Sequence, residues 1–192
     1  STNVQALKEA EAVVDEFTVA VSDGLLSDSE SLTFKVSGTN DAPTSVSLAN
    51  TSVNENAAGA VVGQLSAVDV DGDALTFNLS TVSADDSDLF TINSDNELKL
   101  KSTTTLDRED GTSAHVVTVL VNDGTATTTK TFTVSVSDQN DPATGTVAIT
   151  GDTFIGGTLT AVPTIVDQDG MGSLSYQWLA GGVSIPGETS QT

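Results

Sequence analysis

The sequence predicts an all-β protein made of β-sandwich modules in tandem, and three observations support this prediction. Thr, Ser, Val, Asp and Gly dominate the composition, and the β-branched Thr and Val favour extended strands. Short runs alternate apolar and polar residues with period 2, and they end at Gly, Asp, Asn or Pro. Blocks of sequence repeat at a spacing of about 100 residues, the length of one sandwich domain.

The strands are predicted from this alternation. The predicted strands cover residues 17–21, 32–36, 116–121, 131–136, 147–151, 157–161 and 175–179. The last run contains Trp178, the only tryptophan, which we expect to pack in a core because a tryptophan on the third strand commonly does so. The only short helix candidate is residues 4–13.

The repeat divides the chain into three pieces. Val-Ser-Asp-Gly at 21–24 matches Val-Asn-Asp-Gly at 121–124, and Asn40-Asp41 matches Asn140-Asp141. The spacing predicts the end of one module, then a complete module, then the beginning of a third. These pieces are residues 1–43, 44–142 and 143–192.

Charge and composition exclude several functions. The chain has 6 Lys plus Arg against 27 Asp plus Glu, a formal net charge of −21 at pH 7. Nucleic acids and anionic membrane surfaces both need cationic partners, so neither is expected as a partner. No run of about 18 apolar residues exists, so no direct membrane insertion is expected. Cysteine is absent, so an extracellular domain would need another means of stiffening.

The acidic residues of the middle piece gather at turns, which favours cation binding over plain solubility. Calcium takes six to eight oxygen ligands, many of them from carboxylates. Two carboxylates about 5 Å apart repel each other by roughly 3 kcal/mol at an effective dielectric near 20, so clustering without a cation is costly. The clusters are residues 54–56, 69–73, 107–109, 123 and 138–141.

Five elements in this piece resemble the cadherin repeat. They are a Glu on the first strand, an Asp-x-Asp turn, a Leu-Asp-Arg-Glu motif, a lone Asp after a strand and an Asp-x-Asn-Asp linker. Here they fall at Glu55, at 69–71, at 106–109, at Asp123 and at 138–141. The resemblance implies immunoglobulin-like, cadherin-like Greek-key sandwiches joined end to end, with calcium between consecutive modules.

The resemblance also implies the calcium ligands. At the lower junction they are Glu55, Asp107, Glu109, the Gln139 carbonyl and Asp141, while Asn140 joins Asp167 and Asp169 of the next module. At the upper junction Asn40 joins Asp69, Asp71 and Asp123. Calcium is the only cofactor implied.

The outer pieces depart from this pattern. Leu7-Lys8-Glu9-Ala10 stands where Leu-Asp-Arg-Glu would fall, so we expect fewer ions at the upper junction than at the lower one. The tail at 36–43 resembles the end of a VCBS repeat, a module of giant RTX-type bacterial surface adhesins. The last piece, with Tyr-Gln-Trp-Leu at 176–179, resembles the start of a bacterial immunoglobulin-like repeat.

Catalytic chemistry is not expected. The run at 69–73 begins like an EF-hand loop, but Ala74 and Ser80 stand where that loop needs Gly and Glu. His115 is the only histidine, and without cysteine the usual zinc sites are missing. At the start of a strand, His115 is expected to be a surface residue.

The sequence therefore predicts a calcium-rigidified extender segment of a secreted or cell-surface bacterial adhesin. Calcium would stabilise the fold in the way that disulfide cross-links do in other extracellular proteins. Its expected partners are calcium ions and neighbouring repeats of the same chain, and the distal ligand is not predicted. Two alternatives stay open: a direct adhesive module, homophilic or glycan-binding, and an accessory domain of a secreted hydrolase.

Overall fold

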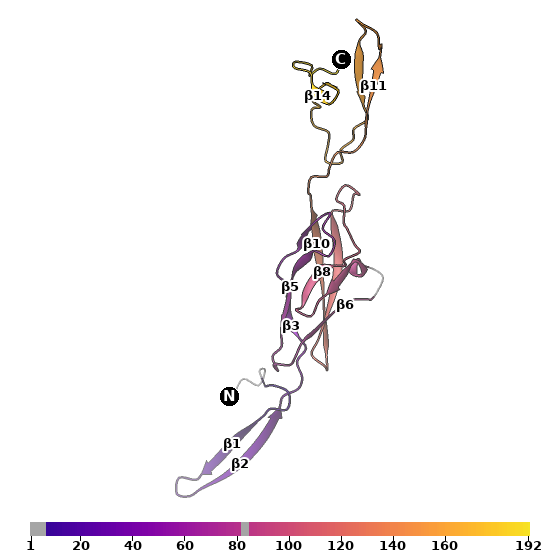
Figure 1. Ribbon diagram of the computed structural model, residues 1–192. Helices are drawn as coiled ribbons and strands as arrows, with labels where there is room; N and C mark the ends of the chain where they lie inside the picture. Colours follow the sequence, from indigo (N-terminus) through magenta and orange to yellow (C-terminus); the bar gives the residue numbers. More distant parts are fainter. Residues whose placement is uncertain (1–6, 82–84) are drawn as a thin grey trace. The chain divides into compact units, whose positions relative to one another are not determined.

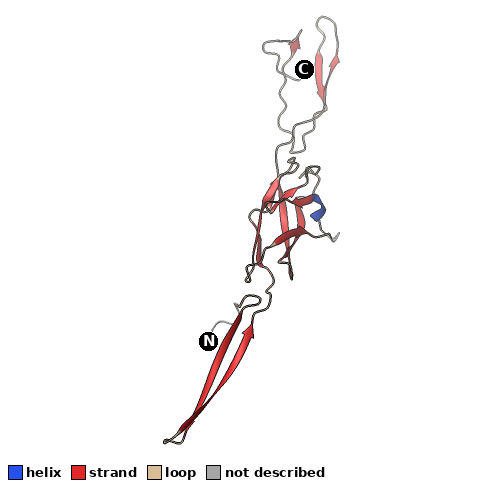
Figure 2. Cartoon of the chain, turned by 60° about the horizontal axis from the view of Figure 1, so that its bottom comes forward, coloured by secondary structure: helices blue, strands red, loops and turns tan. Residues whose placement is uncertain are grey.

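The computed structural model describes residues 7–81 and 85–192, and these are built almost entirely from β-strands and loops (Figures 1 and 2). Within those residues the only helical turn is the 3-10 helix η2 (Ser87–Leu89). The predicted all-β class is confirmed. The chain divides into two compact units, Ser1–Ser137 and Asp138–Thr192.

A long hairpin, β1 (Ala12–Ser22) and β2 (Ser27–Ser37), begins the described strands. The two strands pair antiparallel from Ala12↔Ser37 to Ser22↔Ser27. In the turn, Asp23 Oδ1 accepts the amide hydrogens of Leu25 and Leu26 at 2.9 and 2.8 Å. Gly24 has φ +92°, which few other residues adopt without strain. The two strands predicted in this region are confirmed.

The predicted helix at 4–13 is wrong in its described part, and residues 4–6 lie outside the described residues. Ala10 is in the left-handed region, with φ 64°, and the Glu11 amide donates to the Lys8 carbonyl at 3.0 Å. This turn ends any helical path, and β1 begins at Ala12.

Residues 44–137 form a two-sheet sandwich (Figure 1). The first sheet has the order β4-β10-β9-β6, with β4 parallel to β10 and the other pairs antiparallel. Its strands are β4 (Ser52–Asn54), β6 (Thr76–Leu79), β9 (Ala114–Asn122) and β10 (Thr127–Ser137). The second sheet has the antiparallel order β3-β5-β8-β7. Its strands are β3 (Thr44–Leu48), β5 (Val61–Val68), β7 (Phe90–Ile92) and β8 (Glu97–Leu100).

The core lies between these two sheets. Alternate residues of β9 are buried, as the period of a strand requires, while those between them are more exposed. The second sheet contributes Phe90, Leu98 and Leu100, which are also fully buried. The buried cluster is Val53, Val62, Leu65, Phe90, Leu98, Leu100, Leu106, Val117, Val119, Val121, Val134 and Val136.

The second unit has two short antiparallel pairs. β11 (Val147–Gly151) pairs with β12 (Leu159–Pro163), and β13 (Leu179–Ala180) pairs with β14 (Val183–Ser184). The strand predicted at 175–179 is therefore limited to its last residue. Trp178 is half-buried, and its Nε1 donates to the Ser190 carbonyl at 2.9 Å.

Candidate metal centre

Glu55 is a buried carboxylate directly after β4. The side chain is only 2% exposed. Because β4 runs parallel to β10, the Glu55 amide donates to the Ser137 carbonyl at 3.1 Å. Its Oε2 accepts the Arg108 amide at 2.5 Å. An ionised carboxylate buried this deeply is costly unless positive charge or hydrogen bonds compensate it.

Two further carboxylates lie beside Glu55, and this group forms the lower set. Oxygens of Glu55, Asp107 and Glu109 lie within 4.8 Å of one another. Arg108 lies between the last two in the chain, and its Nη1 donates to the Val136 carbonyl at 3.1 Å. Each pair of charges at 4.8 Å repels by about 3 kcal/mol at an effective dielectric near 20. The structure thus brings together three of the residues predicted for the lower junction.

A tight turn gathers the second group, the upper set. Oxygens of Asp69, Asp71 and Asp73 lie within 4.8 Å of one another. Asp69 Oδ1 accepts the amides of Asp71, Gly72 and Asp73 at 2.9, 3.0 and 3.4 Å. Gly72, at φ +83°, permits this turn. The other oxygen, Asp69 Oδ2, is buried and has no hydrogen-bond partner.

The segment before the sandwich reaches this upper set. Asn40 Nδ2 donates to Asp123 Oδ2 at 3.1 Å, and the Asp41 amide donates to Asp71 Oδ2 at 2.7 Å. Asn40 Oδ1, like Asp69 Oδ2, is buried without a hydrogen-bond partner. Leaving such an acceptor unsatisfied costs about 1–3 kcal/mol, so both oxygens are suited to a cation. All four residues predicted for the upper junction thus lie in one connected group.

Asp123 is held in its ionised form by the hairpin turn that contains it. The Ala126 and Thr125 amides donate to Oδ1 at 2.6 and 2.7 Å. These two hydrogen bonds, followed by that from Asn40, hold the pKa of the Asp123 carboxyl below its ordinary value, while burial opposes them. A cation ligand must be deprotonated, so this turn favours binding.

The donors of both sets are oxygens of carboxylates and one amide. Hard divalent cations prefer oxygen ligands, and clustered carboxylates fit calcium's large and flexible coordination shell. Two buried acceptors without donors, and a buried Glu beside two other carboxylates, fit a calcium ion at each set.

The remaining predicted residues lie in the second unit. The Asp141 amide donates to a carboxylate oxygen of Asp169, and the Asp169 amide donates to Asp167 Oδ1 at 3.1 Å. Asn140 Nδ2 donates to the Asp141 carbonyl at 2.9 Å, and Gln139 Nε2 to the preceding carbonyl. That these residues share ions with the first unit stays a prediction.

Two acids of the predicted clusters were not assigned as ligands from the sequence. Asp73 joins Asp69 and Asp71, and a carboxylate oxygen of Asp138 lies within 4.8 Å of one from Asp169. Period-2 spacing could have added Asp73, since it stands two residues after Asp71 and four after Asp69. The Asp-x-x-Gly-Asp pattern, which is typical of such turns, was a second signal.

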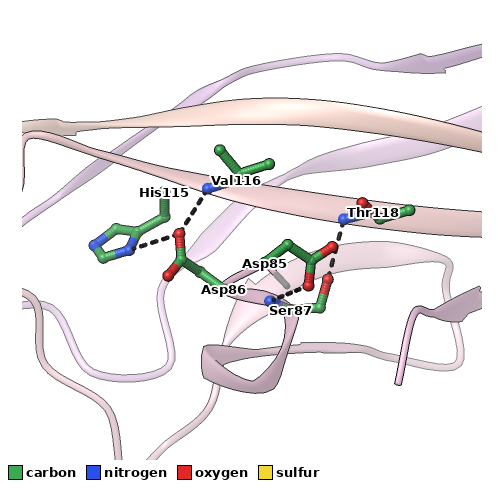
Figure 3. Close-up of polar contacts among 6 residues, drawn as sticks. All are labelled: Asp85, Asp86, Ser87, His115, Val116 and Thr118. Carbon is green, nitrogen blue, oxygen red and sulfur yellow. Dashed lines mark hydrogen bonds and ion pairs between the residues drawn. The ribbon is translucent and has the colours of Figure 1, made fainter. Parts of the chain in front are cut away.

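The expectation that His115 is a surface residue is wrong, since it is 8% exposed (Figure 3). Its Nδ1 lies 3.4 Å from Asp86 Oδ2, and its ring meets Phe90 edge to face with centroids 6.4 Å apart. Asp86 Oδ2 also accepts the Val116 amide at 2.8 Å. His115 therefore helps to fasten the segment before η2 onto β9.

Ser87 fastens the same segment one step further along β9 (Figure 3). Its Oγ accepts the Thr118 amide at 3.0 Å, and its own amide donates to Asp85 Oδ1 at 3.1 Å. Hydrogen bonds from the Thr118 side chain, and then from Ser87, hold the pKa of the Asp85 carboxyl below its ordinary value. The contacts of this group are those of a structural clasp.

The middle of the chain matches the model of a known domain family. Residues 49–137, a little under half of the chain, match the family model of the cadherin domain. This confirms the resemblance seen in the sequence for that region. No curated protein matches the chain.

Solved cadherin ectodomains are among the similar structures. Human protocadherin-24 EC1-2 is 24% identical with a TM-score of 0.46, and the match covers 72% of this chain and 67% of that one. A second crystal form of that fragment gives 22%, a TM-score of 0.44 and 66% of each chain. Mouse protocadherin-24 EC1-3 gives 19% and 0.43, and the match covers 81% of this chain and 56% of that one.

Across residues 7–81 and 85–192, no helix has both the length and the apolar character that a bilayer crossing needs.

Proposed function

We propose that this chain is a calcium-stiffened extender segment of a secreted or bacterial cell-surface adhesin. In this role it has no catalytic activity, and it holds a distal binding domain away from the cell. The cadherin-domain match of residues 49–137 supports an extracellular, adhesion-related role. The bacterial setting rests on the VCBS-like tail at 36–43 and on the absence of cysteine.

The observation that carries the proposal is the lower set. Glu55 is buried and has Asp107 and Glu109 carboxylates within 4.8 Å. Solubilising acids would spread over the surface, where their mutual repulsion is weak. Two carboxylates drawn together beside a buried third are expected where a divalent cation supplies the compensating charge.

Calcium bound at these two sets would tie separate segments together. In the lower set, Asp107 and Glu109 belong to the loop before β9, whereas Glu55 follows β4. In the upper set, Asn40 precedes the sandwich, whereas Asp69, Asp71 and Asp123 belong to it. Calcium supplies the charge that offsets carboxylate repulsion, and the residues supply position and ionised oxygens.

The modular division expected from the sequence belongs to the same proposal. Residues 1–43 and 143–192 are read as parts of modules that flank the complete one at 44–142. Neighbouring repeats of the same polypeptide are then the main protein partners. An extender needs stiffness within and between modules, and calcium is the proposed source of it.

Calcium titration calorimetry tests the binding step. We expect a dissociation constant of about 10⁻⁴ to 10⁻³ M, the range of extracellular modules. Glu55→Gln and Asp69→Asn should each weaken binding at their own set by at least about tenfold, through loss of one ligand charge. Glu30→Gln, on the exposed strand β2, is the matched control and should leave binding unchanged. An absence of binding heat at millimolar calcium would overturn the proposal.

Stability and scattering test the mechanical step. Binding to the folded state alone stabilises by about 2.7 kcal/mol at a hundredfold excess over Kd, so EGTA should lower the melting temperature. Small-angle scattering should give a larger maximum dimension and fewer conformers with calcium than with EGTA. Superimposable scattering curves would mean that calcium binds without stiffening, and the extender role would then be wrong.

A further inference from the structure

The hairpin β1–β2 carries an apolar face that lies exposed. Phe17 and Leu32 are directly paired, so both point to this face, and the Phe17 and Phe34 rings meet edge to face at 5.8 Å. The opposite face is mostly polar apart from Val14, and it has a Thr18–Ser31 side-chain hydrogen bond of 2.8 Å. The exposed apolar residues of the face are Phe17, Val19, Val21, Leu32, Phe34 and Val36. A contiguous patch of this kind marks an interaction surface.

A covered version of this hairpin exists in the same chain. The pair β9–β10 has the same register 100 residues later, since Phe17↔Leu32 corresponds to Val117↔Phe132 and Ser22↔Ser27 to Asn122↔Thr127. Its face is buried: Val119 is 0% exposed, whereas the equivalent Val19 is 66% exposed. The difference therefore lies in what covers the hairpin.

Two kinds of contact cover β9–β10. The sheet β3-β5-β8-β7 packs on the apolar face through residues such as Phe90 and Leu98. At the edges, β4 runs parallel to β10 and β6 runs antiparallel to β9. All these strands lie within residues 44–100, ahead of the hairpin in the chain.

A second copy of the hairpin does not fit this face. Strands of 11 residues make a two-stranded ribbon. Such a ribbon is roughly 35 Å long and roughly 10 Å wide, so two copies face to face would bury roughly 700 Å². Stable interfaces exceed about 1,000 Å². Asp15, Asp28 and Glu30 also point to this face, and a second copy would bring further acids against them.

We propose that β1–β2 is a docking surface for the first strands of a module of this kind, a segment with the strand pattern of residues 44–100. Because such strands precede the hairpin in the complete module, the partner is polypeptide that precedes β1. It places one strand antiparallel along β1, one parallel along β2, and an apolar sheet over Phe17 and Phe34. Backbone hydrogen bonds at the edges and alternate apolar contacts supply recognition. The inference rests on the modular part of the proposed function and is independent of its calcium.

The repeat provides the test molecule. A second copy of residues 44–100 is fused directly ahead of Ser1, so that its Leu100 is followed by Ser1, the counterpart of Lys101. Hydrogen exchange of the β1 and β2 amides is then measured in EGTA, with and without the extension. We expect at least tenfold slower exchange in the extended chain, and loss of the fluorescence of an apolar dye that binds the open face.

Matched variants separate docking from a general effect. Val19→Asp, on the apolar face, should abolish the protection in the extended chain, whereas Thr18→Asp, on the polar face, should leave it. The amides of the added copy of residues 44–100 should be protected from hydrogen exchange only when the apolar face of β1–β2 is intact.

Three results would overturn the proposal. The first is equal exchange of β1–β2 in the extended and original chains. The second is an added copy that stays unprotected beside the unaltered hairpin. The third is a concentration-dependent dimer of the original chain, seen by sedimentation, in which β1–β2 is already protected, since the occupant would then be a second copy. Because EGTA is present throughout, failure of calcium binding would change none of these results.

Discussion

The hairpins β1–β2 and β9–β10 have the same register and the same turn, yet one has an exposed apolar face and the other a buried one. In both turns an aspartate accepts two amides: Asp23 from Leu25 and Leu26, and Asp123 from Thr125 and Ala126. Both turns continue with a glycine at positive φ. Local sequence is therefore enough to specify the hairpin, whereas burial depends on strands elsewhere.

The largest expected difference concerns matched valines. Val119→Ala should destabilise the sandwich by about 2 kcal/mol, because it removes buried methyl groups and leaves a cavity. Val19→Ala should cost less than about 0.5 kcal/mol, since Val19 is mostly exposed. Urea unfolding of both variants measures this. Equal destabilisation by the two substitutions would mean that Val19 is buried by another segment in solution.

A smaller and more equal effect is expected at the turns. Gly124 and Gly24 have φ +104° and +92°, and an added Cβ would meet nothing within 4 Å at either position. Gly→Ala at either site should therefore cost about 1 kcal/mol from backbone strain alone. Gly124→Ala should appear in global unfolding of the sandwich, and Gly24→Ala in faster hydrogen exchange of β1–β2. A larger destabilisation by Gly124→Ala than by Gly24→Ala would contradict the prediction that the two turns have equal backbone strain.

The smallest expected effect concerns the pKa values of the two turn aspartates, which NMR titration in EGTA measures. The Leu26 and then Leu25 amides hold the pKa of Asp23 below its ordinary value of 3.8, and the Ala126 and Thr125 amides do the same for Asp123. A lowered folded-state pKa contributes stability that is present above the ordinary value and is lost as the pH falls through the folded one.

Only Asp123 has an additional hydrogen bond, from Asn40. Asn40→Ala should therefore raise the pKa of Asp123 and leave that of Asp23 unchanged. A shift at both aspartates would show that Asn40 acts through the fold rather than through this contact.

The same comparison shows what sequence patterns can predict. Alternation located β1, β2, β9 and β10, because period 2 is a property of the strand itself. It could not distinguish Val19 from Val119, since both occupy apolar positions of the same repeat. The burial of His115 was missed for the same reason, because it depends on Asp86 and Phe90 from distant segments.

Some residues of the candidate site could likewise be predicted from the sequence, and others could not. Asp107 and Glu109 could be paired from their spacing, whereas Glu55 was predicted only through the resemblance to the cadherin repeat. Asp73 could have been added from its spacing to Asp71, whereas the closeness of Asp138 to Asp169 joins residues far apart in the chain and has no local signal. The failed helix at 4–13 has a related cause, since the left-handed Ala10 reverses a chain whose composition favours a helix.

The clasp on β9 has a consequence for aggregation. Asp86 Oδ2 and Ser87 Oγ occupy the Val116 and Thr118 amides, and the Asp86 amide occupies the Val116 carbonyl. Two side chains thus occupy the places of a neighbouring strand, so this edge cannot template a foreign one. Among the described strands, β1 pairs only with β2. Resistance of that hairpin to amyloid-like stacking then depends on the chain's net charge of −21, and salt should weaken it.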